Sequence, residues 1–256
     1  MESRSYPPRP AAVYLFGTCL VDLFVPEAGL DAVHLLEREG LRVHFPQRQS
    51  CCGQPAYTSG NPDAARAVAR AQIDLLAESW PIVVASGSCA GMMRHHWPDL
   101  FAGDADYADK ARDIAERVFE FAEFLVRVLG VRYDAADRSP ARVALHTSCS
   151  ARREMDTRSH GVELLAALPG VERVDHGSES ECCGFGGIFS LKHPEISGAM
   201  VRDKLDSLAA TGCERVVSAD LGCLLNIGHA AEHRRFPLAA EHLATFVRRR
   251  LEGGKP

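Results

Sequence analysis

Eight of the nine cysteines in the chain form two matching sets of four. The sets are Cys19, Cys51, Cys52 and Cys89, and then Cys149, Cys182, Cys183 and Cys223. From the single cysteine to the pair the interval is 32 residues in the first set and 33 in the second, and from the pair to the last cysteine it is 37 and 40. Matching intervals indicate a duplicated unit. Each unit is predicted to gather its four cysteines as ligands of one metal centre.

Each adjacent pair of cysteines is followed by a glycine, Gly53 or Gly184. Neighbouring side chains in a strand point to opposite faces, whereas a turn can aim both thiols at one centre. Glycine permits a positive φ or a close approach of the backbone to a cofactor. We therefore assign Gly53 and Gly184 to the cofactor-binding loops. A disulfide within a pair is disfavoured, because consecutive Cα atoms lie closer than disulfides usually allow.

Four thiolates suit an iron–sulfur cluster or a tetrahedral zinc ion. The chain contains no Cys-x-x-Cys pair, the spacing typical of structural zinc. Widely dispersed cysteines favour a cluster, and zinc in one lobe stays as the alternative. Cys213 has no counterpart in the repeat, and we interpret it as a plain buried cysteine.

Short apolar runs alternate with amphipathic segments along both halves of the chain. Strands are expected at 11–16, 42–45, 82–85, 142–145, 171–174 and 215–218, with helices at 30–39 and 62–79 and at similar places in the second half. This alternation predicts an α/β fold of two similar lobes related by a pseudo-twofold axis, each with a small parallel sheet flanked by helices. The cysteines follow the strands, at the sheet edge where α/β proteins bind ligands.

The predicted lobes are residues 1–103 and 140–256. Between them, residues 104–139 are expected to form a linking segment. An apolar stripe of Ile114, Val118, Phe121, Leu125 and Val128 predicts one long amphipathic helix over 104–129.

Composition limits the class of protein. The chain has 256 residues, of which 46% are hydrophobic and 25% charged, and its net charge is −5. No basic stripe indicates nucleic-acid binding, and no apolar run reaches the roughly 20 residues of a membrane span. No secretory signal is apparent either, so we expect a cytoplasmic protein, where reducing conditions disfavour disulfides.

Three histidines lie near the cysteines in the sequence, His95, His96 and His146. Each is a candidate donor of a hydrogen bond to the sulfur atoms of a cluster. Asp220 lies three residues before Cys223, and we expect a helix cap or a loop hydrogen bond from it. No flavin or nicotinamide fingerprint was found, which favours a relay of electrons over direct substrate oxidation.

Four segments carry a resemblance to a known family. They are Cys51-Cys-Gly-Gln-Pro, Ser86-Gly-Ser-Cys-Ala-Gly-Met-Met, Glu181-Cys-Cys-Gly-Phe-Gly-Gly and Asp220-Leu-Gly-Cys-Leu-Leu-Asn. The chain resembles the cysteine-rich CCG domain family over residues 11–246. Where the full family motif ends with a further cysteine, this chain has Met92 and Asn226. That departure makes heterodisulfide cleavage at a five-cysteine cluster an unfavoured function, and we expect structural roles for both residues.

The resemblance implies an iron–sulfur subunit with one or two clusters, of the 4Fe-4S type. It implies electron transfer in a complex that oxidises L-lactate to pyruvate. The implied partners are a subunit with ferredoxin-type clusters and a third small subunit. The alternatives are a zinc-stabilised scaffold, or a subunit of a glycolate oxidase or heterodisulfide reductase type of complex.

Overall fold

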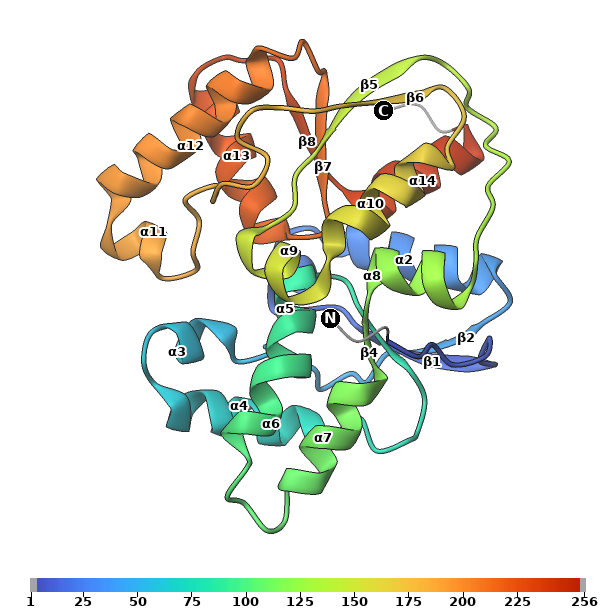
Figure 1. Ribbon diagram of the computed structural model, residues 1–256, viewed down its shortest axis with the longest axis vertical. Helices are drawn as coiled ribbons and strands as arrows, with labels where there is room; N and C mark the ends of the chain where they lie inside the picture. The colour runs from blue at the N-terminus through green and yellow to red at the C-terminus, as the bar shows by residue number, and fades with distance from the viewer. Residues whose placement is uncertain (1–3, 254–256) are drawn as a thin grey trace.

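The computed structural model describes residues 4–253, which form two parallel sheets with helices between and around them (Figure 1). The first sheet has the order β2-β1-β3-β4, and the second has the order β6-β5-β7-β8. The first contains β1 (Ala12–Phe16), β2 (Arg42–His44), β3 (Ile82–Val84) and β4 (Val118–Glu120). The second contains β5 (Ala141–Leu145), β6 (Val171–Val174), β7 (Arg215–Ser218) and β8 (Ala239–His242). The expected fold class is confirmed, because both sheets share one strand order and every pairing is parallel.

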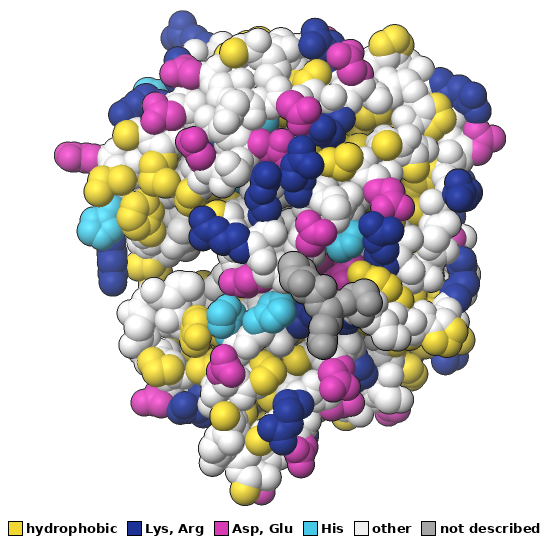
Figure 2. All heavy atoms as spheres, viewed as in Figure 1, with side chains coloured by type: hydrophobic (Ala, Val, Ile, Leu, Met, Phe, Trp, Pro, Cys, Tyr) yellow, Lys and Arg dark blue, Asp and Glu magenta, His cyan; other side chains and the backbone are white. Residues whose placement is uncertain are grey.

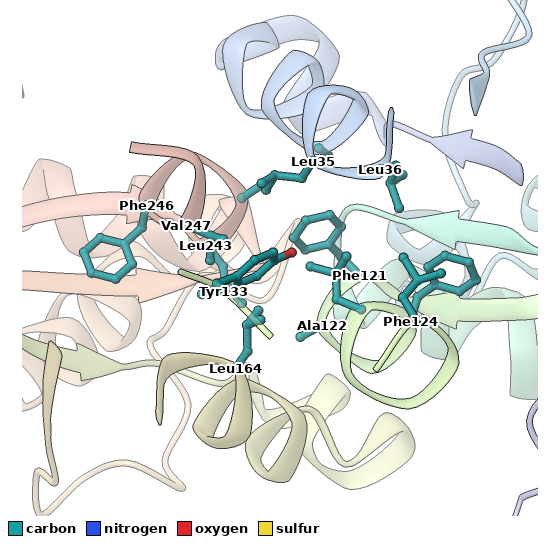
Figure 3. Packing of buried hydrophobic residues seen from close by; sticks show 14 of the residues in the cluster. Leu35, Leu36, Phe121, Ala122, Phe124, Tyr133, Leu164, Leu243, Phe246 and Val247 are labelled. Atoms are coloured by element: carbon teal, nitrogen blue, oxygen red, sulfur yellow. The ribbon is translucent and has the colours of Figure 1, made fainter. Parts of the chain in front are cut away.

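The largest apolar core lies between the two sheets (Figure 3). It is built by α2 (Pro26–Arg38), α8 (Phe121–Glu123), the π-helical turn η2 (Phe124–Val128), α10 (Thr157–Ala166) and α14 (Leu243–Glu252). Leu35, Phe121, Phe124, Leu164 and Val247 are completely or almost completely buried there. The two lobes therefore share a hydrophobic core, whose burial stabilises their relative position.

The outer face of each sheet has a core of its own. The first is covered by α4 (Pro62–Ile73), η1 (Met92–His96), α6 (Trp97–Leu100) and α7 (Ala108–Arg117), and the second by α12 (Pro194–Ala209) and α13 (Leu221–His233). Prolines at the starts of α2, α4 and α12 suit the first turn of a helix, where the backbone N–H has no intrahelical partner.

The expected single helix over 104–129 is wrong. The segment instead contains α7, then strand β4, then α8 and η2. The stripe interpreted as one helical face includes Val118, which starts β4 and pairs with Ile82. All three residues of β4 are buried, so tertiary packing at the sheet edge outweighs the helical pattern. The division of the chain into residues 1–103, 104–139 and 140–256 stays a prediction.

Short helices bring the lobes together at the carboxyl ends of the strands. Helix α5 (Gly87–Gly91) packs on α9 (Cys149–Met155), and α1 (Cys19–Phe24) contacts α13, as the neighbouring labels α5 and α9 in Figure 1 illustrate. A Cβ atom on Gly87 would lie 2.6 Å from the Cβ atom of Ala151, so this contact requires glycine. Over residues 4–253, no helix is both long and apolar enough to cross a membrane.

Candidate metal centre

The single cysteines of both sets lie where a strand gives way to a helix. Cys19 and Cys149 are the first residues of α1 and α9, shortly after β1 and β5. Cys89 and Cys223 lie in α5 and α13, shortly after β3 and β7. The structure thus puts these thiols at the carboxyl edges of the two sheets, as the sequence predicts.

The first set is drawn together by the loop after β2. The Sγ atoms of Cys19 and Cys51 are 3.7 Å apart, and those of Cys52 and Cys89 are 3.2 Å apart. The backbone N–H of Gly53 donates to Cys51 Sγ at 3.4 Å. Four thiols from three loops therefore converge on one place, which is the arrangement that a thiolate-bound centre needs.

The second set repeats this geometry. The N–H of Gly184 donates to Cys182 Sγ at 3.3 Å. A ring nitrogen of His146 and the Sγ atoms of Cys183 and Cys223 all lie within 4.8 Å of one another. The second lobe therefore adds an imidazole to its cysteines.

Gly53 and Gly184 are required by conformation and by space. Their φ angles are +86° and +87°, a region that favours glycine. A Cβ atom would lie 3.1 Å from the carbonyl oxygen of Ala65 at Gly53, and 2.6 Å from that of Ser197 at Gly184. Gly53 lets its cysteine loop lie against α4, and Gly184 lets its loop lie against α12. Whether these residues also contact a cofactor stays a prediction.

Two side-chain N–H groups hold the backbone of the cysteine pairs. Trp97 Nε1 donates to the carbonyl oxygen of Cys52 at 2.9 Å, and Asn226 Nδ2 donates to that of Cys183 at 2.8 Å. Met92, the counterpart of Asn226, is completely buried in the first outer core. Asn226 thus makes a structural contact, whereas Met92 packs in the core and also lines the space beside the cysteines. That neither residue is a ligand stays a prediction. Cys213 is also buried, in the second outer core, where its thiol donates to the carbonyl oxygen of Leu208 at 3.7 Å.

The thiols of each set perturb one another. Contact with Cys19, followed by contact with Cys52, lowers the pKa of Cys51 to about 3. Contact with Cys149 likewise lowers the pKa of Cys182 to about 2. Hydrogen bonding to Cys51 raises the pKa of Cys19, and hydrogen bonding to Cys182 raises that of Cys149. Each set therefore favours a thiolate at the first cysteine of its pair, and the thiolate is the form that binds metal.

Both cysteine sets open into one cavity of about 830 Å³. All eight paired and single cysteines of the repeats contribute to its lining, together with segments of α3 (Gln54–Thr58) and α11 (Phe189–Lys192). Figure 2 shows the notch at the molecular edge between the parts of the chain that carry these two helices. The sequence predicts two centres but does not predict that they share a cavity.

The three candidate histidines have different environments. Nε2 of His95 bonds the carbonyl oxygen of Glu154 at 3.0 Å, and Nε2 of His96 bonds Glu154 Oε1 at 3.3 Å, so both are engaged at the lobe contact. His146 is 1% exposed, and neither of its ring nitrogens has a hydrogen-bond partner within residues 4–253. A buried polar atom without a partner is costly. Because the ring lies close to Cys183 and Cys223, a metal ion or a cluster would fit as its missing partner.

Asp220 has a role that local sequence could not show. Its Oδ1 atom accepts hydrogen bonds from Ser86 Oγ and from the N–H of Ser88, both at 2.9 Å. The expected cap is present, but the capped helix is α5 of the opposite lobe. The only hint of this contact in the sequence is the repeat itself, because Asp220 and Ser86 stand at equivalent positions, three residues before Cys223 and Cys89.

The cysteine geometry agrees with what the comparisons show. The sequence profile of a cysteine-rich domain family, CCG, matches residues 13–94 and again 143–228. The chain belongs to the CCG family. The two matches cover the two cysteine sets, so the resemblance seen in the motifs is confirmed.

Relatives of this CCG chain are similar over nearly their whole length. Lactate utilization protein A of Bacillus subtilis is 40% identical over 238 residues, which are 93% of this chain and 99% of the relative. Lactate utilization protein A 1 of Bacillus mycoides is 39% identical over 244 residues, 94% of this chain and 99% of the relative. A crystal structure of a hypothetical protein from Helicobacter pylori aligns with a TM-score of 0.61 at 11% identity, covering 99% of this chain and 51% of that one. This last likeness supports the fold.

Proposed function

We propose that the chain is an iron–sulfur electron-transfer subunit of a cytoplasmic oxidoreductase complex that oxidises L-lactate to pyruvate. The observation that carries the proposal is the convergence of two four-cysteine sets on one cavity, in a chain similar to lactate utilization protein A over more than nine-tenths of its length. When bound, an iron–sulfur cluster supplies one-electron chemistry. The partners proposed with it are a ferredoxin-type iron–sulfur subunit and a third small subunit.

The residues of the chain supply the ligands and their surroundings. Cys19, Cys51, Cys52 and Cys89 would hold one cluster, proposed as 4Fe-4S. Cys149, Cys182, Cys183 and Cys223 would hold the other. The N–H groups of Gly53 and Gly184 already donate to cysteine sulfur, an interaction that stabilises negative charge on a thiolate.

The overall reaction defines what the subunit must accept. Oxidation of L-lactate to pyruvate releases two electrons and two protons. In the proposed complex the substrate is held by a partner, and this chain receives the electrons and passes them on. The wall of the cavity is mostly apolar, which lowers the local polarity around the cysteine sets and strengthens electrostatic interactions there.

One observation favours a second candidate, zinc in the second lobe. Cys183 and Cys223 with His146 form a sulfur and nitrogen donor set that also suits tetrahedral zinc. The second lobe would then be structural, and the first alone would be redox-active.

Anaerobic purification followed by analysis of iron, acid-labile sulfide and zinc tests the proposal. Wild type, Cys51→Ser and Cys182→Ser are compared, and Cys213→Ser is the matched control because Cys213 is a buried cysteine outside both sets. The proposal expects iron and sulfide in the wild type and in the control, with a share lost in each of the other variants. Zinc without iron, even after reconstitution with iron and sulfide, would overturn it.

A further inference from the structure

The two centres share a backbone frame but differ in two buried side chains. Three residues before the first cysteine of each set stand Phe16 and His146. The glycine of each pair lies against Ala65 or Ser197, and seven residues further along the same helices stand Gln72 and Lys204. At both positions the second lobe has an ionisable residue where the first has none.

Gln72 and Lys204 each hydrogen bond to the residue before a cysteine pair, but only Lys204 carries a charge. Gln72 bonds the backbone N–H and the hydroxyl of Ser50, the residue before the first pair, at 3.0 and 2.9 Å. Lys204 Nζ donates to the carbonyl oxygens of Glu181, the residue before the second pair, at 2.9 Å, and of Ser178. Lys204 is 1% exposed. Burial lowers the pKa of Lys204, whereas its two carbonyl acceptors and the neighbouring cysteine sulfurs favour the ammonium form. Lys204 is thus placed to act as a cation beside the second cysteine pair.

Burial makes this charge effective. Coulomb interactions are weakly screened away from water, so a buried cation acts more strongly on a nearby centre than a surface charge does. The nearby carboxylate of Glu181 is on an exposed side chain, where solvent screens it. Asp220 is buried at the contact between the lobes, where its carboxylate bonds Ser86 and Ser88 near Cys89 and also stands three residues before Cys223. Its charge therefore acts on both centres, and Lys204 is the buried charge that distinguishes them.

His146 adds to the same difference. Its ring is buried within reach of Cys183 and Cys223, and both ring nitrogens lack partners among the described residues. An imidazole N–H directed at cluster sulfur, or an imidazole ligand in place of a thiolate, raises a reduction potential. Phe16, its completely buried counterpart, offers neither.

We infer that the centre of the second lobe has the higher reduction potential of the two and takes up an electron first, because Lys204 and His146 stabilise added negative charge there. This inference rests on the proposed function. It assigns an order to two centres that their cysteine ligands alone do not distinguish.

Anaerobic redox titration of the full chain, followed by EPR, tests the order. Cys51→Ser leaves the second centre to be measured, and Cys182→Ser leaves the first. The potential measured in Cys51→Ser is expected to exceed that in Cys182→Ser. Adding Lys204→Gln to Cys51→Ser introduces the residue of the first lobe, and should weaken reduction at least tenfold, a shift of about 59 mV to lower potential for one electron.

His146→Phe in the Cys51→Ser background provides an independent test if Lys204→Gln fails to fold, and should also lower the potential. Lys204→Arg keeps the charge and should keep the potential close to that of the parent. Equal potentials in the two single variants, or a higher one in Cys182→Ser, would overturn the inference. Zinc in the second lobe would also overturn the inference, while the proposed function would still hold for the first centre. If neither variant could be reduced, both the inference and the proposed function would be contradicted.

Discussion

Ser86 and Asp220 occupy equivalent positions in the two repeats, and their side chains hydrogen bond to each other at 2.9 Å between Oγ and Oδ1. The local pseudo-twofold axis therefore passes close to this pair. Each residue stands three positions before a cysteine, Cys89 or Cys223. The bond links the two loops that carry these cysteines, and so it couples the geometry of the two sets.

Replacement of Asp220 by alanine should destabilise the whole chain. The variant loses the acceptor for the hydroxyl of buried Ser86 and for the N–H of half-buried Ser88. Unsatisfied buried donors predict a loss of about 2–3 kcal/mol in the free energy of unfolding, measured by chemical denaturation. Asp22→Ala, which removes an exposed carboxylate, is the control and should have a small effect. Equal stability of the two variants would contradict this role of Asp220.

The contact between α5 and α9 should not tolerate a side chain at Gly87. A Cβ atom there would lie 2.6 Å from Ala151 Cβ and 2.9 Å from Thr157 Cγ2. Overpacking of this kind costs about 1–3 kcal/mol, so Gly87→Ala should lower the melting temperature. Gly103→Ala is the matched control, because nothing lies within 4 Å of its added Cβ atom. If Gly87→Ala melts at the temperature of the control, the lobes do not pack as described.

The cysteine loop of the second lobe should depend on Gly184. Gly184→Ala combines a positive φ of +87° with a Cβ atom 2.6 Å from the carbonyl oxygen of Ser197. Gly60→Ala has a similar φ of +79° but open space, so it separates backbone strain from the clash. We expect Gly184→Ala to lose iron and sulfide together with stability, and Gly60→Ala to lose only about 1 kcal/mol of stability. Full iron content in Gly184→Ala would be the contrary result.

Glu120 should make stability depend on pH. Burial raises its pKa from 4.5 to about 8, so the folded chain binds a proton in this window that the unfolded chain has lost. The free energy of unfolding therefore falls as pH rises from about 4.5 to about 8, by at most about 1.4 kcal/mol per pH unit from this group. Glu120→Gln imitates the protonated form and should show a shallower decline in denaturation experiments across that range. Parallel pH profiles would show that Glu120 is ionised at neutral pH.

Much of the fold could be predicted from residue types and spacing. The cysteine intervals revealed the repeat, and the apolar runs located β1 to β3 and their counterparts β5 to β7. The fourth strands were missed. Strand β4 is three residues long and lies in a segment with helical periodicity, and its strand conformation depends on pairing with β3.

The candidate site was predictable in its residues and not in its arrangement. The cysteine loops could be predicted from local patterns, because a Cys-Cys-Gly segment after a strand favours a turn in which the glycine has a positive φ. The bond between Ser86 and Asp220 joins residues 134 positions apart, which no local pattern encodes. The common cavity and the burial of Lys204 are likewise results of tertiary packing.

The most direct test of the account is the number of electrons that each chain accepts. Anaerobic coulometric titration is performed on the wild type, Cys51→Ser and Cys182→Ser, with Cys213→Ser as the control. The wild type and the control should accept the same number, and each of the other variants should accept fewer while its remaining centre stays reducible. A wild-type chain that binds metal and accepts no electrons would contradict it, and the two cysteine sets would then be structural.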